Sequence, residues 1–95
     1  MTRHALIALL ALSVLTGCLD VTGSRVTVER AGPDDLLKLR AGPGRGFRVI
    51  VGLPDGTDLI QRDCVTEEGQ RWCRVSLAEA PSLTGYVSAD YLSRF

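Results

Sequence analysis

The sequence predicts a small all-β domain that follows a short N-terminal leader. Several short stretches alternate apolar and polar residues and are rich in Val, Ile and Thr, which is the pattern of half-buried strands. Gly and Pro interrupt these stretches at close intervals, as turns do. Beyond residue 24, no stretch keeps the apolar spacing of a helix for long enough to form one. Together, these observations favour a small barrel or sandwich.

The first residues have the pattern of a secretory signal. Arg3 and His4 provide a positive start, an apolar run follows over 5–15, and small residues stand just before Cys18. A membrane-spanning helix needs about 20 apolar residues, and this run is about half that length. We therefore expect a cleaved leader rather than a permanent membrane span.

The end of this leader predicts where the protein resides. The tetrad "LTGC" (15–18) resembles the lipobox of bacterial lipoproteins, which implies that Cys18 receives lipid once residues 1–17 are removed. An ordinary secretory peptide with a nearby cysteine is the alternative. The resemblance implies a lipid-anchored, periplasm-facing protein of the bacterial envelope. Leu19, rather than an aspartate, follows the cysteine, and Asp20 comes one place later, so the outer membrane is favoured over the inner one.

The cysteine count predicts one disulfide. The chain has three cysteines, an odd number for an exported protein. If Cys18 carries lipid, Cys64 and Cys73 remain as a pair that an oxidising compartment would join. Two separate buried thiols are the alternative. Closing a loop of about ten residues would stabilise the domain by roughly 2.5–3 kcal/mol.

The predicted strands follow from alternation, and their ends follow from turn residues. In "PDGT" (54–57), Pro and Asp favour the bend and Gly supplies a positive φ. "EEGQ" (67–70) is expected to join two antiparallel strands, whereas 78–85 is expected to be a loose loop and 89–91 a single turn. The predicted strands are 25–30, 36–40, 47–53, 58–66, 71–77 and 86–88.

The glycine-rich stretch "LRAGPGRGF" (39–47) could either cradle a phosphate or reverse the chain. Phosphate loops lie between a strand and a helix, but this stretch lies between two predicted strands. Pro43 removes one backbone amide, and the Gly-Lys-Ser/Thr ending of a P-loop is missing. We therefore expect a chain reversal.

Composition and residue types argue against several function classes. The formal net charge is zero, so there is no basic excess for nucleic acid. The only histidine, His4, belongs to the leader, which leaves no His for a catalytic triad or a metal site. The acidic pairs Asp34/Asp35 and Glu67/Glu68 fall in predicted turns, where solvated carboxylates are common. We expect no enzyme activity, no cofactor and no metal.

Three ordered motifs resemble the bacterial SH3-like (SH3b) family. They are "LLKLRAGPGRGFRVIVGLPDGTDLIQ", "GQRWCRV" and "TGYVSADYLS", and they extend over roughly 34–93. The resemblance implies a partly open barrel of five or six strands over 25–95, and the lipobox implies a lipidated N-terminus and spacer at 18–24 before it. Such domains are usually non-catalytic and bind peptidoglycan peptides or protein segments. The Cys64–Cys73 pair departs from most members.

Two aromatic side chains are candidate ligand contacts. Alternation along 71–77 places Trp72 on the face opposite Cys73, Val75 and Leu77, so Trp72 either contacts a ligand or covers the open end of the barrel. Tyr91 matches, by resemblance, the groove tyrosine of SH3-type folds.

The neighbouring positions qualify this candidate site. Ser88 stands where eukaryotic relatives often have a proline, which weakens the analogy with proline-rich ligands. Tyr86 and Phe47 are expected in the core.

The resulting hypothesis is an envelope-anchored, non-catalytic module that contacts cell-wall peptide or a protein partner. The alternative is an accessory subunit that packs on one fixed partner and has no ligand groove of its own.

Overall fold

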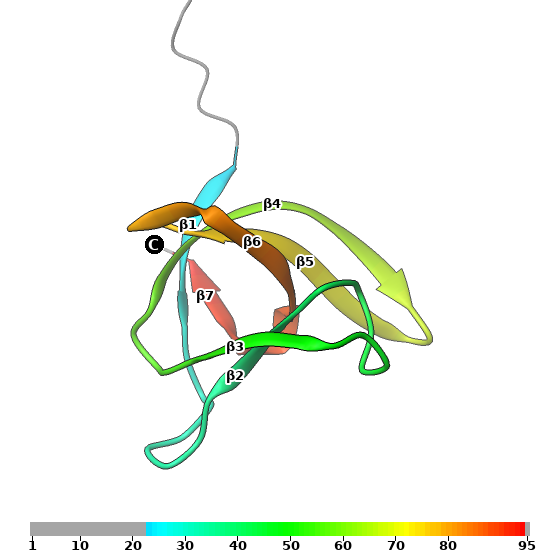
Figure 1. Cartoon of the computed structure of the whole chain (residues 1–95), viewed down its shortest axis with the longest axis horizontal. Coiled ribbons are helices and arrows are strands. Elements are labelled where there is room, and N and C mark those ends of the chain that lie inside the picture. The colour runs from blue at the N-terminus through cyan, green and yellow to red at the C-terminus, as the bar shows by residue number, and fades with distance from the viewer. Residues whose placement is uncertain (1–22, 95) are drawn as a thin grey trace, which may run out of the picture.

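The computed structural model describes residues 23–94, which form one antiparallel sheet that curls into a half-barrel (Figure 1). Cys18 and the leader lie outside the described residues. Within the described part, no helix is long and apolar enough to cross a membrane. The elements are β1 (Ser24–Val28), β2 (Leu37–Arg40), β3 (Val49–Leu53), β4 (Asp58–Glu67), β5 (Gln70–Leu77), β6 (Ala80–Ser88), the 3-10 helix η3 (Ala89–Tyr91) and β7 (Leu92–Arg94).

The strand order of the sheet is β3-β2-β6-β5-β4-β1-β7. β1 pairs with both β4 and β7, so the first and last described strands lie side by side. β2 and β6 are far apart in the sequence but meet where Arg40 pairs with Tyr86. This crossing brings the loops around β2 close to the end of β6. The all-β, SH3-like fold is confirmed, with seven strands rather than five or six, because residues 92–94 add a strand against β1.

The core is aliphatic and is built from alternate residues of six strands. Cys73 and Val75 are buried in it and Leu77 packs against it, as alternation predicted for β5. The buried members of the core are Val26, Val28, Leu37, Leu39, Leu53, Leu59, Cys73, Val75 and Val87. No aromatic side chain belongs to this cluster, although Trp72 is also buried.

Both predicted turns are confirmed. Glu68 and Gly69 have φ values of 52° and 80°, as a two-residue hairpin turn of type I′ requires, and they join β4 to β5. In the other turn, the amide of Thr57 donates to the carbonyl of Pro54 at 3.2 Å, and Gly56 has φ 91°.

The prediction of a loose loop at 78–85 is wrong, because β6 begins at Ala80. Pro81 is tolerated because the only β6 residue that pairs with β2 is Tyr86, so the start of β6 has a neighbour on one side only. Further along, the hydroxyls of Ser76 and Thr84 lie 3.2 Å apart across β5 and β6. Pairing with β5 therefore holds this weakly patterned segment as a strand.

The glycine-rich stretch reverses the chain between β2 and β3, as expected. The amide of Ala41 donates to the carbonyl of Arg48 at 2.9 Å, which closes the loop. The ring of Phe47 packs on Gly42, where a Cβ would lie 2.5 Å from a ring carbon. Phe47 is 48% exposed, so the prediction that it lies in the core is wrong. Its ring covers Gly42 of the same loop instead of entering the barrel. Tyr86 is half-buried.

Candidate functional site

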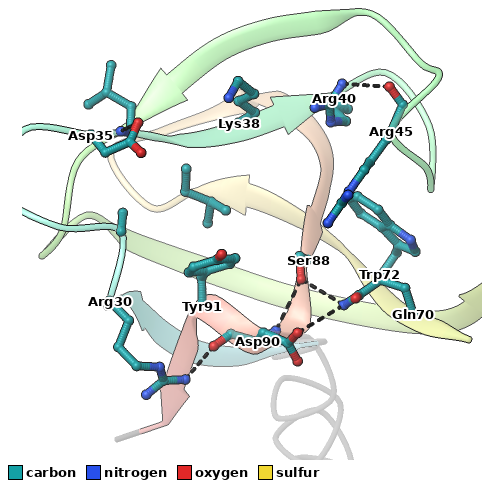
Figure 2. A pocket seen from close by; sticks show the side chains of 13 residues that line it. Arg30, Asp35, Lys38, Arg40, Arg45, Gln70, Trp72, Ser88, Asp90 and Tyr91 are labelled. Atoms are coloured by element: carbon teal, nitrogen blue, oxygen red, sulfur yellow. Dashed lines mark hydrogen bonds between the residues drawn. The ribbon is translucent and has the colours of Figure 1, made fainter.

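A groove of about 410 Å³ lies where β2 faces the end of β6 (Figure 2). One side is formed by β2 and the loop that follows it, and the other by η3 and the residue before it. The start of β5 closes one end of the groove. Its volume falls within the range of small-molecule and short-peptide pockets.

Trp72 lines this groove near the start of β5. It pairs with Val65 of β4 and Ser88 of β6, on the face of the strand opposite the core. The prediction of its face is confirmed, but Trp72 is only 5% exposed, so it does not project freely into solvent. The side chain of Arg45 extends towards it in Figure 2. Trp72 is therefore a buried side chain that lines the groove, and its contact with a ligand stays a prediction.

Tyr91 lines the same groove from the last position of η3 and is 37% exposed. Ser88 caps η3, because its hydroxyl accepts a hydrogen bond from the amide of Asp90 at 3.4 Å. The carbonyl of Tyr91 accepts from the amide of Glu29 at 2.8 Å, which ties η3 to the end of β1. The fold thus brings together the two aromatic residues that the sequence singled out.

A hydrogen-bond network fixes η3 against β5. The side-chain amide of Gln70 donates to the hydroxyl of Ser88 at 2.8 Å and to the carboxylate of Asp90 at 3.4 Å. The guanidinium of Arg30 donates to the backbone carbonyl of Asp90 from the other side (Figure 2). Sequence reasoning missed Arg30, Gln70 and Asp90, because no local pattern shows that three distant segments meet.

Three cationic side chains lie along β2 and the loop that follows it: Lys38, Arg40 and Arg45 (Figure 2). Arg40 is committed to the fold, because its guanidinium donates to the carbonyls of Arg45 and Phe47, each at 3.0 Å. Within residues 23–94, the charged ends of Lys38 and Arg45 make no hydrogen bond or ion pair. These two charges are therefore available to a ligand. Sequence analysis did not single them out.

The hairpin of β4 and β5 holds Trp72 in register. Cys64 and Cys73 pair directly across the two strands, and the structure joins them in a disulfide. Asp63 and Arg74 form an ion pair at 2.7 Å. The hydrogen bond from Arg74 lowers the pKa of Asp63 below its usual value. The disulfide thus lies next to Trp72 in the chain and fixes the strand that carries it.

A second hollow, of about 530 Å³, lies on the other side of Trp72. It is lined by the glycine-rich loop, including Phe47, and by Glu67 and Glu68 of the β4–β5 hairpin. Arg45, Gln70 and Trp72 line both hollows, so they form the ridge between them.

Few groups in the described part resemble a metal or catalytic site. Among residues 23–94, no cluster of three or more His, Cys, Asp or Glu side chains could hold a metal ion. The acidic pairs Asp34/Asp35 and Glu67/Glu68 are exposed, as expected for turn residues.

The structure is a small SH3-like all-β domain with a groove that two aromatic residues line. No protein-family profile matches the chain, and no solved structure matches it. Over 72 residues, 76% of its length, the chain is 33% identical to the "Putative N-acetylmuramoyl-L-alanine amidase YrvJ" of Bacillus subtilis (strain 168). The matched region is 12% of that protein, so the chain is similar to a small part of an amidase.

Proposed function

We propose that this protein is a non-catalytic binding module that contacts cell-wall peptide in the bacterial envelope. The observation that carries the proposal is the groove itself, which is lined by Trp72, Tyr91 and the charged side chains of Lys38 and Arg45. Large aromatic residues with polar neighbours are common anchors of peptide interfaces, because they desolvate well and lose little rotamer entropy on binding. The similarity to part of a protein named for N-acetylmuramoyl-L-alanine supports a wall component as the ligand.

The absence of catalysis is part of this proposal. The described residues contain no histidine, and the structure joins Cys64 to Cys73, so neither sulfur is a free thiolate nucleophile. Incubating the chain with purified peptidoglycan and measuring released soluble fragments tests this. We expect release no faster than in buffer alone, and time-dependent release would contradict the proposal.

The wall-binding function is tested by co-sedimentation of the chain with purified peptidoglycan. We expect binding by the wild type and weaker binding by Tyr91→Ala. Val51→Ala is the matched control, because Val51 is also 37% exposed but lies outside the groove. Equal loss of binding in both variants, or no binding by the wild type, would contradict the proposal.

The envelope location rests on Cys18, which lies outside the described residues. We propose that Cys18 carries lipid and anchors the domain to a membrane, with the outer membrane favoured. Stable anchoring requires more than one acyl chain. Cys18→Ser should abolish metabolic labelling with a fatty-acid analogue, and unchanged labelling would exclude Cys18 as the acceptor.

One observation favours the alternative of an accessory subunit. β3 is an edge strand of the described sheet, it contains no charged residue, and Val49 and Val51 are 43% and 37% exposed. Charges usually block further pairing of natural edge strands, and β3 has none, although its register against β2 shifts between Leu39 and Arg40. If β3 docks on a fixed envelope partner, Val51→Lys should abolish recovery of that partner from envelope extract and leave peptidoglycan binding unchanged.

A further inference from the structure

The two long sides of the groove differ in their chemistry. Lys38 and Arg45 lie along one side, with charges that are not used within residues 23–94. The opposite side carries the carboxylate of Asp90 and the phenol of Tyr91 (Figure 2). Within residues 23–94, the carboxylate of Asp90 accepts one long hydrogen bond, at 3.4 Å from Gln70, so it retains most of its acceptor capacity.

The balance of charge in the groove favours an acidic ligand. Arg30 is paired with Glu29, so its charge is compensated. Lys38, Arg40 and Arg45 then face the carboxylates of Asp35 and Asp90, which leaves the groove with an excess of positive charge although the chain as a whole is neutral. Asp35 is also partly committed, because its carboxylate accepts from the amide of Leu36 at 2.8 Å.

We infer that the groove selects a short peptide that carries more carboxylates than ammonium groups. Its carboxylates lie against Lys38 and Arg45, its single ammonium lies against Asp90, and an apolar side chain between them rests on Trp72 and Tyr91. This inference rests on the proposed function and specifies its ligand. A neutral glycan would leave Lys38 and Arg45 without partners, and a proline-rich segment would supply neither charge.

The single tryptophan of the chain makes this inference directly measurable. Trp72 is the only Trp and lines the groove, so its fluorescence reports on occupancy. The purified chain is titrated at low salt with the tetrapeptide Ala-Glu-Ala-Ala, which has two carboxylates and one ammonium, with the same peptide amidated at both carboxylates, and with the same peptide acetylated at its one amine. We expect amidation to weaken binding about tenfold or more, and acetylation to weaken it less. Equal affinity for all three peptides would overturn the inference.

Variants of the chain test which side of the groove binds the carboxylates of the peptide and which side binds its ammonium. Arg45→Gln and Lys38→Gln should each reduce the preference for the free acid over the amidated peptide. Asp90→Asn should instead reduce the preference for the peptide with the free amine over the acetylated one. Arg71→Gln is the matched control, because Arg71 is exposed but does not line the groove. If Arg71→Gln changes selectivity as much as Arg45→Gln does, the effect comes from net charge alone and the inference fails.

Failure of the inference can be distinguished from failure of the proposed function. Peptidoglycan co-sedimentation without any preference among the three peptides would overturn the inference and leave the wall-binding function standing. If the chain prefers the free-acid peptide but does not co-sediment with peptidoglycan, the inferred charge preference stands and the wall-binding function fails. The ligand would then be an acidic segment of an envelope protein.

Discussion

Trp72→Ala should cost this domain about 3 kcal/mol of unfolding free energy, in addition to weakening ligand binding. A tryptophan side chain buries about 150–250 Å². At about 25 cal/mol per Å², full burial corresponds to about 4–6 kcal/mol. Trp72 is 5% exposed, so nearly all of this area counts. Because it lies against a groove and not inside the core cluster, water can enter the space it leaves, which places the cost at the lower end of the usual 3–5 kcal/mol.

The loss would be a large fraction of the total stability. At 0.05–0.15 kcal/mol per residue, a domain of the size described has an unfolding free energy of about 4–11 kcal/mol. The melting temperature should fall by about 12–24 °C, given about 4–8 °C per kcal/mol in domains of this size. Urea denaturation followed by far-UV circular dichroism measures the free energy, because the variant has no tryptophan to observe.

Two further variants separate stability from binding. Trp72→Phe keeps an aromatic ring in the same place and should cost about half as much as the alanine variant. Tyr91→Ala removes a side chain that is 37% exposed, so it should weaken binding while costing less stability than Trp72→Ala, about 2 kcal/mol. A loss below 1 kcal/mol for Trp72→Ala would refute the burial argument and show that Trp72 acts only as a ligand contact.

Three other changes test the fold that supports the groove. Replacing Cys64 and Cys73 together by Ala should cost about 2–3 kcal/mol in urea denaturation, because the disulfide closes a loop with a sequence separation of 9; two alkylated thiols in unreduced protein would contradict the bond. The pKa of Asp63 is lowered in the folded state, so its pairing with Arg74 stabilises the domain at pH values above the unfolded pKa, and this stabilisation is lost as pH falls through the folded pKa. In Arg74→Gln, an NMR titration should show the pKa of Asp63 rising towards its usual value. An unchanged pKa would refute the pairing. Gly85→Ala should lower the unfolding free energy by about 2 kcal/mol or more in thermal denaturation, because the new Cβ would lie 2.7 Å from the carbonyl oxygen of Arg40. A loss of stability within about 0.5 kcal/mol would show that β2 and β6 do not approach each other this closely.

Local patterns determined most of the strands and the turns that join them. Alternation along 71–77 predicted that Cys73 and Val75 face the core, and the structure places them there. The residues of "EEGQ" predicted the β4–β5 turn, because Gly tolerates a positive φ. These features depend on neighbours within a few residues, so the sequence contains the information needed to predict them.

The sequence also singled out Trp72 and Tyr91, but only the tertiary structure shows that they line one groove. Trp72 follows from strand alternation and Tyr91 from family resemblance, and neither argument states a distance. Both residues line the groove because Ser88 of β6 pairs with Trp72 of β5, and η3, which ends in Tyr91, follows directly after Ser88.

Only the tertiary structure decided how exposed each aromatic residue is and which charges face the ligand. Phe47 was expected inside but covers Gly42 on the surface, and Trp72 is buried although it lies opposite the core. Lys38 and Asp90 belong to segments that are far apart in the chain, and the crossing of β2 with β6 brings them to one groove. Strand periodicity states which face of a sheet a side chain occupies, whereas burial and charge pairing depend on what the curled sheet and its loops place over that face.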